Sequence, residues 1–88
     1  MPKHLVFVEG KAKKQFKKLP KENQERILLA LKTLEDEGLS TRLDIKKLHG
    51  YKNHYRIRVG KIVRILFELS TDQRIVVFSI STREKAYE

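Results

Sequence analysis

The apolar positions near the start of the chain change from a continuous run to helical spacing. Residues 5–8 are all apolar and Gly10 follows them, which predicts a short strand. The next apolar residues recur four and three positions apart, as on one face of a helix; they are Ala12, Phe16 and Leu19. Pro20 cannot continue that helix and suits the first turn of another.

A wider apolar stripe extends from residue 21 to about residue 37 and predicts a second, longer helix. Its members are Ile27, Leu28, Leu31 and Leu34. Gly38 suits the position after a helix end, where glycine is favoured. Only Leu19 and Pro20 separate the two helices, so we expect an αα-hairpin.

Strand patterns fill most of the second half of the chain. Three strands are predicted at residues 54–59, 62–69 and 74–80. Turns are predicted before the first of them, at residues 50–53, and before the last, at residues 71–73. Leu43, Ile45 and Leu48 add a short extended segment before them. The order β-α-α-β-β-β predicts an α+β fold of two layers, with the helix pair on one face of a mostly antiparallel sheet. The opposite face is then free to bind a ligand.

Three arginines stand among the apolar residues of the first two of these strands. Arg56 and Arg58 alternate with apolar side chains, and Arg64 does so in the next strand. A hairpin loop at residues 60–62 pairs Arg58 with Arg64, whereas a loop one residue shorter would turn Arg64 into the core. We expect the longer loop, which places the three arginines on the face away from the helices, with His54 beside them.

Guanidinium groups that converge in this way repel one another, by about 1 kcal/mol per pair in a water-like dielectric. An anionic ligand would offset that repulsion. Arginine offers phosphate oxygens a planar set of several donors, so a phosphate site is the favoured interpretation. The alternatives are an ion pair with Glu68 or another acid, and side chains that spread into solvent.

The composition also indicates an anionic partner. The chain has 88 residues, which predicts one domain spanning residues 1–88, and 20 Lys+Arg against 11 Asp+Glu give it a net charge of +9. Lysines crowd the first predicted helix, where they form either a solvated face or a non-specific contact with an RNA backbone. They are Lys11, Lys13, Lys14, Lys17, Lys18 and Lys21.

Several other kinds of site are absent from the sequence. The chain has no cysteine, no glycine-rich phosphate loop and no HExxH motif, so we expect neither a metal nor a cofactor. The apolar run at the N-terminus is too short for a signal peptide or a membrane span, which predicts a cytoplasmic protein without membrane contact. His4 and His49 lie near turns and are expected at the surface. Aromatic residues are few and mostly assigned to the core, which disfavours a platform that stacks single strands.

Nearly the whole chain resembles toxins of the RelE/ParE superfamily, and more closely the RelE branch. The resemblance lies in "KKLP", "KLHGYKNHYRIRVG", "RILFEL", "IVVFSIS" and the terminal "TREKAY", in this order and spacing. It implies the two-layer fold already argued. It also implies the toxin of a type II toxin–antitoxin system, a ribosome-dependent endoribonuclease that cleaves mRNA in the A site by 2′-hydroxyl attack on the adjacent phosphate. The implied partners are the ribosome, mRNA and an acidic antitoxin that folds on binding, in a toxin–antitoxin hetero-oligomer.

Five positions match residues that RelE-type toxins use for catalysis. They comprise the basic pair on the strand after the glycine turn, the arginine after the hairpin, the arginine past the last strand and the terminal tyrosine: Arg56, Arg58, Arg64, Arg83 and Tyr87. The resemblance implies that the arginines neutralise the transition state and that the tyrosine stacks on or orients a base, or transfers a proton. An arginine stays protonated and is a poor base. The proton acceptor is therefore open among His54, Lys85 and Tyr87, or the ribosome supplies it.

Two features depart from the family pattern. The hairpin "GKIVR" is one residue longer than the common "GDYR" and lacks its tyrosine, and both members of the basic pair are arginine where some relatives have lysine. Two other functions stay open. One is a ParE-like inhibitor of DNA gyrase, which generally does not need the arginines and tyrosine as a set; the other is a basic nucleic-acid-binding module without chemistry.

Overall fold

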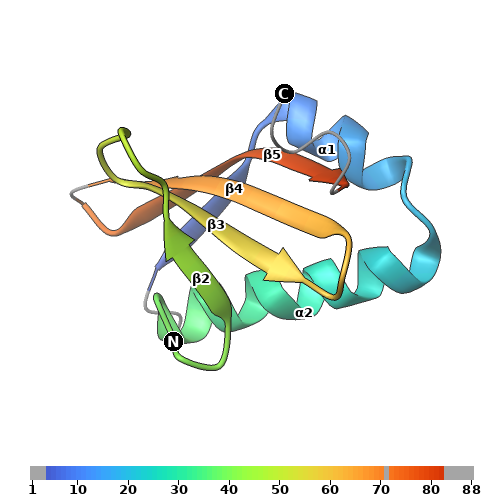
Figure 1. The fold of residues 1–88 in the computed structure, drawn as a ribbon, viewed down its shortest axis with the longest axis horizontal. Coiled ribbons are helices and arrows are strands. Elements are labelled where there is room, and N and C mark those ends of the chain that lie inside the picture. Colours follow the sequence, from blue (N-terminus) through green and yellow to red (C-terminus); the bar gives the residue numbers. More distant parts are fainter. Residues whose placement is uncertain (1–3, 71, 83–88) are drawn as a thin grey trace.

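The computed structural model describes residues 4–70 and 72–82, in which two helices cover one face of a five-stranded sheet (Figure 1). Its elements are β1 (Leu5–Val8), α1 (Gly10–Lys17), α2 (Lys21–Glu37), β2 (Asp44–Lys47), β3 (His54–Val59), β4 (Val63–Leu69) and β5 (Arg74–Thr82). The α+β class and the αα-hairpin are as expected. Neither helix in this part of the chain is long and apolar enough to cross a membrane.

The sheet has one strand more than the sequence predicts. The extended segment before the turn at residues 50–53 is strand β2, which pairs antiparallel with β3 and forms an edge of the sheet. The strand order is β1-β5-β4-β3-β2, and β1 pairs parallel with β5. The sheet is therefore mixed, and β2 brings two more charged side chains, Asp44 and Lys46, beside β3.

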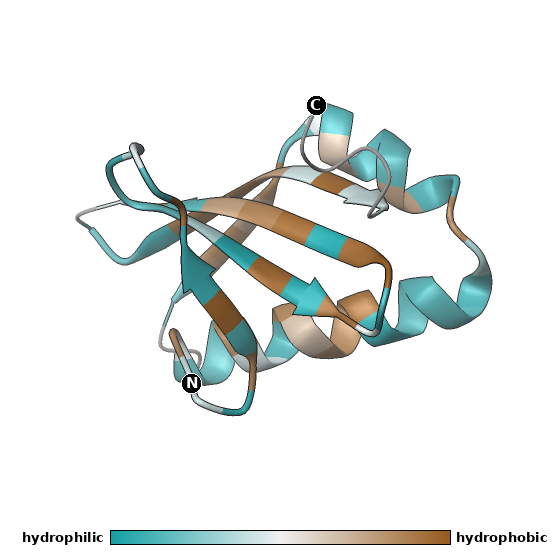
Figure 2. Ribbon diagram, in the orientation of Figure 1, coloured by the Kyte–Doolittle hydropathy of each residue, from teal (hydrophilic) through white to brown (hydrophobic). Residues whose placement is uncertain are grey.

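The core lies between the helices and the sheet. Its buried side chains include Ala12 on α1, Ile27 and Leu34 on α2, and apolar residues of three strands, β3, β4 and β5: Ile57, Val63, Ile65, Phe67, Ile75, Val77 and Ile80. Figure 2 shows apolar and polar residues alternating along β3, and a polar band in the otherwise apolar course of β4. The side chains of opposite parity therefore lie on the face of the sheet that the helices leave uncovered. We call this the open face.

The β3–β4 hairpin has the register predicted from parity. Val59 pairs with Val63 and Arg58 with Arg64, which leaves the loop at residues 60–62. Gly60 in this loop has a φ of 63°, the left-handed conformation that a three-residue hairpin loop requires at one position. The expected placement of Arg64 outside the helix-covered core is confirmed.

His4 was expected at the surface, and the structure contradicts this. It is half-buried against the end of α2, where its ring packs on Gly38. Gly38 has a φ of 71°, and its N–H donates to the carbonyl of Leu34 at 2.8 Å. The backbone N–H of His4 also donates to the carbonyl of Glu35 at 3.0 Å, so the start of the chain is attached to the last turn of α2.

One side chain connects the two helices. The Gln24 Nε2 atom donates to the carbonyls of Phe16 at 3.1 Å, Leu19 at 3.0 Å and Lys17 at 3.4 Å. Carbonyls in the last turn of a helix have no partner within that helix. Gln24 on α2 therefore supplies donors to the end of α1 and fixes the angle of the αα-hairpin.

Gln24→Ala should lower the free energy of unfolding by about 1–2 kcal/mol, because half-buried carbonyls lose their donor. The neighbouring Glu25→Ala is the matched control: Glu25 is exposed, and a surface change of this kind is worth less than about 0.5 kcal/mol. Urea unfolding followed by circular dichroism measures both. Equal effects of the two substitutions would show that Gln24 does not hold the helices together.

Candidate nucleic-acid interface

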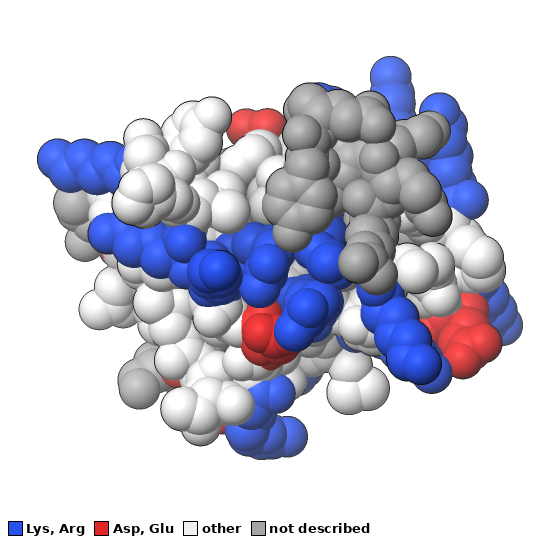
Figure 3. All heavy atoms as spheres, viewed as in Figure 1, with Lys and Arg blue, Asp and Glu red and all other residues white. Residues whose placement is uncertain are grey.

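Two rows of paired residues cross the open face from β2 to β5. Because paired residues of neighbouring strands point to the same side, each row gathers four side chains. The first row is Asp44, Arg58, Arg64 and Ser81, and the second is Lys46, Arg56, Leu66 and Ser79. Figure 3 views this face and shows basic side chains in a band across it. The structure thus brings Arg56, Arg58 and Arg64 together, and we call them the arginine cluster.

Arg58 already has a counterion. Its Nε lies 2.7 Å from Oδ2 of Asp44, and each side chain is 48% exposed. The acid that pairs with the cluster is therefore Asp44 on β2, and the expected candidate Glu68 makes no ion pair among the described residues. An ion pair this exposed contributes at most about 1 kcal/mol, so solvent or a ligand can compete for Arg58.

Arg64 and Arg56 lie in a different environment. Only 4% of the surface of Arg64 is exposed, and its Nε and Nη1 atoms have no hydrogen-bond partner within the described part of the chain. The same holds for Nε of the half-buried Arg56. A buried donor without a partner costs about 1–3 kcal/mol, and more when it is charged. An oxyanion is the kind of acceptor that these donors lack.

His54 lies on the same face, at the start of β3. Its Nδ1 is 2.7 Å from the carbonyl oxygen of Lys52, and a carbonyl can only accept, so Nδ1 carries a hydrogen. In the neutral ring Nε2 is then the atom that can accept a proton. Glu68, which is exposed, pairs with His54 in the β3–β4 register.

The α1 lysines form a separate surface. Lys11, Lys13, Lys14, Lys17 and Lys18 are all exposed, and Lys21 at the start of α2 is exposed as well. Ala12 between them faces the core, so α1 belongs to the helical layer. The lysines and the arginine cluster therefore lie on opposite layers of the molecule. Three other candidate site residues from the sequence, Arg83, Lys85 and Tyr87, lie outside the described residues.

Sequence reasoning missed three other members of the open face. Lys46 extends the second row, and its signal was the short extended segment that becomes β2. Tyr51 is 62% exposed in the loop between β2 and β3, and Phe78 contacts His54 from β5. The expectation that aromatic residues are used in the core holds for Tyr55, which stacks on Phe67, and not for Tyr51.

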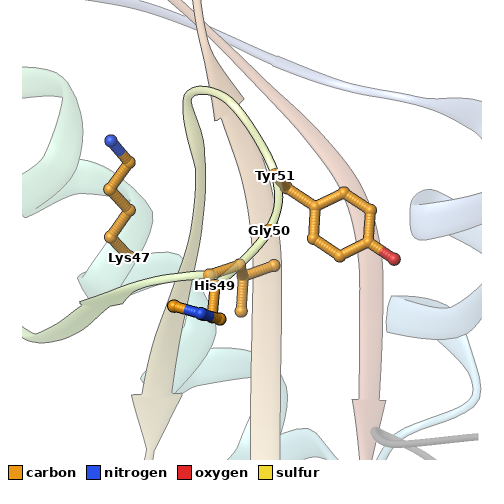
Figure 4. A pocket seen from close by; sticks show the side chains of 5 residues that line it. Lys47, His49, Gly50 and Tyr51 are labelled. Atoms are coloured by element: carbon orange, nitrogen blue, oxygen red, sulfur yellow. The ribbon is translucent and has the colours of Figure 1, made fainter.

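A shallow pocket of about 410 Å³ adjoins this region. The residues that line it come from the end of β2 and the loop that follows: Lys47, Leu48, His49, Gly50 and Tyr51. Figure 4 shows the Tyr51 ring projecting to one side of this loop, and Lys47 and His49 to the other. His49 is exposed, as expected. Among the residues that the structure describes, no group of His, Asp and Glu is arranged to hold a metal ion.

Comparisons with known proteins agree with one another. The model of the phage-derived Gp49-like proteins (DUF891) matches residues 14–85. Toxin RelE3 of Methanocaldococcus jannaschii is 35% identical over 77 residues, which cover 85% of each chain. The RelE1 protein of the same organism is 33% identical over 87 residues, 97% of this chain and 96% of its own. A crystal structure of a RelB–RelE antitoxin–toxin complex from Methanococcus jannaschii matches with a TM-score of 0.82 and 34% identity, covering 93% of this chain and 95% of that one.

Arg64→Met tests whether the buried guanidinium of Arg64 binds an anion. Without phosphate, the variant should be more stable than wild type by about 1–3 kcal/mol, because an unpaired buried charge is replaced by an apolar side chain of similar length. Inorganic phosphate should raise the melting temperature of wild type, because it binds the folded state, and should raise that of the variant less. Melts in phosphate and in sodium chloride of equal ionic strength measure the difference.

Arg42→Met is the matched control, since Arg42 is exposed and paired with Glu37. It should respond to phosphate as wild type does. A large loss of stability in Arg64→Met, with an unchanged response to phosphate, would mean that Arg64 has a structural role and not an anion-binding one.

Proposed function

Since the chain belongs to the RelE family and is a RelE-type toxin, we propose that it is a ribosome-dependent endoribonuclease that cleaves mRNA in the A site. The observation that supports this proposal most directly is the set of orphaned donors on Arg56 and Arg64. Buried donors that lack an acceptor are suited to stabilise an oxyanion as it develops in a transition state.

The reaction is an internal transfer within the RNA. The 2′-oxygen attacks the adjacent phosphorus and loses its proton, the bond from phosphorus to the 5′-oxygen breaks, and that oxygen gains a proton. The products are a 2′,3′-cyclic phosphate and a 5′-hydroxyl. Negative charge collects on the non-bridging oxygens in the transition state, where Arg56 and Arg64 neutralise it. Arg58 joins them by exchanging Asp44 for the phosphate, since its ion pair is half exposed.

His54 is the proton acceptor that we favour among the described residues. Its Nδ1–H is held by the carbonyl of Lys52, which leaves Nε2 free to accept the 2′-hydroxyl proton. It lies two residues before Arg56 on the same strand, at roughly 7 Å along the chain. Arg83, Lys85 and Tyr87 keep the roles that the resemblance implies: a further phosphate ligand, an alternative base, and a group that stacks on a base or transfers a proton.

Dependence on the ribosome follows from what the site lacks. The described residues provide cations and one histidine, but no element that would align the 2′-hydroxyl with the phosphorus. Alignment of the reacting groups can supply about 7–11 kcal/mol of the barrier. The exposed lysines of α1, on the opposite layer, bind the backbone of ribosomal RNA and hold the open face toward the mRNA.

The proposed partner in the inhibited state is an acidic antitoxin, in a toxin–antitoxin hetero-oligomer. Solved structures of similar toxins contain RelB as a partner: the RelB–RelE complexes of Methanococcus jannaschii and Pyrococcus horikoshii, at 34% and 26% identity to this chain. The net charge of +9 favours an acidic segment. An apolar groove of about 180 Å³ in the helical layer suits its apolar side chains, and among its lining residues are the exposed Leu28 and the half-buried Phe16.

Single-turnover cleavage of programmed ribosomes tests the proposal. Arg56→Ala and Arg64→Ala should each lower the rate by about 10²–10³, the usual loss for one preorganised donor to a transition state. Arg42→Ala, an exposed arginine on the connection after α2, should cut as wild type does. Free RNA should be cut far more slowly than ribosome-bound mRNA, because nothing else aligns the reacting groups.

Thermal melts of each variant separate folding from chemistry. If Arg56→Ala and Arg64→Ala both cut at the wild-type rate, the assignment of the arginine cluster is wrong. A wild-type protein that cuts no mRNA and inhibits DNA gyrase would favour the ParE-like alternative. One that does neither and still binds RNA would favour the basic binding module.

A further inference from the structure

Three aromatic rings meet on the open face, next to the arginine cluster. The ring centroids of Tyr51 and His54 are 5.5 Å apart and tilted by 49°. Those of His54 and Phe78 are 5.4 Å apart and nearly edge to face, at 66°. The three residues come from different places in the chain: the loop before β3, the start of β3, and β5. We call them the aromatic platform.

A β-bulge accounts for the position of Phe78. Leu66 on β4 pairs with Ser79, but the next residue, Phe67, pairs with Val77, so Phe78 is the extra residue on β5. Bulges redirect a side chain, and here the ring reaches His54, which lies two strands away across β4. After the bulge, the N–H of Ile80 donates to Oε1 of Gln15 on α1 at 2.8 Å, which gives this irregular stretch of β5 a fixed partner.

The platform has no role in the core. Tyr51 is 62% exposed, although burial of a tyrosine ring is normally favourable. In contrast, Tyr55 faces the helices and stacks on Phe67, at 5.4 Å and 16°. The contacts of Tyr51 with the described aromatic residues hold its ring beside His54 with most of its surface uncovered. A flat apolar surface held in this way is suited to another flat group.

We propose that the aromatic platform stacks an unpaired base of the RNA whose phosphate binds at Arg56. This inference rests on the proposed function only in taking RNA as the ligand. His54 and Arg56 share a strand and a face and are two residues apart, so a base and a neighbouring phosphate of one strand can occupy both sites together. Lys46, paired with Arg56, adds a cation for the backbone that continues from there.

The charge beside the platform favours a base over a second phosphate. Glu68 pairs in register with His54 and is exposed, so it would repel a phosphate at this position. A carboxylate can instead accept hydrogen bonds from the exocyclic amino group of a cytosine or an adenine. The proposal therefore departs from the expectation from composition, which disfavours a stacking platform.

Binding of a fluorescein-labelled oligoadenylate, measured by anisotropy at low salt, tests the platform without cleavage. Tyr51→Ala should weaken binding about 5- to 100-fold, the range found when one stacking aromatic is truncated. Tyr51→Phe keeps the ring and should bind as wild type does. Ile62→Ala is the matched control, because Ile62 is an apolar residue 44% exposed in the β3–β4 loop, at the other end of β3, and its loss should not affect binding.

An abasic ribose-phosphate oligomer of the same length separates stacking from charge. Wild type and Tyr51→Ala should bind it equally, since it has no bases to stack. The proposal is overturned if Tyr51→Ala binds oligoadenylate as tightly as wild type, if it weakens both oligomers alike, or if wild type itself does not bind oligoadenylate.

These outcomes are independent of the nuclease assay. A Tyr51→Ala variant that binds oligoadenylate weakly, in a protein that cuts no ribosome-bound mRNA, would support the platform and contradict the nuclease. Unchanged oligoadenylate binding by the variant, in a protein that cuts mRNA in the A site, would contradict the platform and support the nuclease.

Discussion

The pairing of Arg58 with Arg64 across β3 and β4 is the constraint on which the open face depends. Side chains alternate along each strand, so one register sends the apolar residues of β4 to the helices and Arg64 away from them. A shift of one residue would bury that guanidinium under α2 and expose Ile65, now fully buried. Gly60 helps to fix the register, because its left-handed conformation permits the three-residue loop.

The same register gives the arginines unequal environments. Arg58, near the β2 edge, meets Asp44 and stays half exposed, whereas Arg64, in the middle of the sheet, is covered and has no described hydrogen-bond partner for two of its nitrogens. An unpaired buried cation lowers stability. A site of this kind is explicable when a ligand supplies the missing charge, and in the proposed function the scissile phosphate does so. Arg64, whose burial lowers the stability of the fold most, is then the arginine whose interaction with the charge of the transition state is most favourable.

Parity and spacing predicted the helices, the three long strands and the side of the sheet that Arg56 and Arg64 occupy. They could not predict that Asp44–Lys47 forms a full strand, because four residues with two lysines carry no clear alternation, and pairing with β3 decides the matter. Phe78 was also beyond prediction from local pattern. Its direction depends on a bulge, which is set by how β5 pairs with β4 and not by the residues of β5 alone.

The two-layer fold gives a basic chain two separate surfaces. The α1 lysines lie in the helical layer and the arginine cluster lies on the open face, with the hydrophobic core between them. In the proposed function the lysines bind ribosomal RNA and the arginine cluster binds mRNA. In the proposed function the net charge of +9 serves two interfaces: the lysines need little geometry to attach the domain to an RNA backbone, while the arginines, whose positions strand register fixes, bind the scissile phosphate.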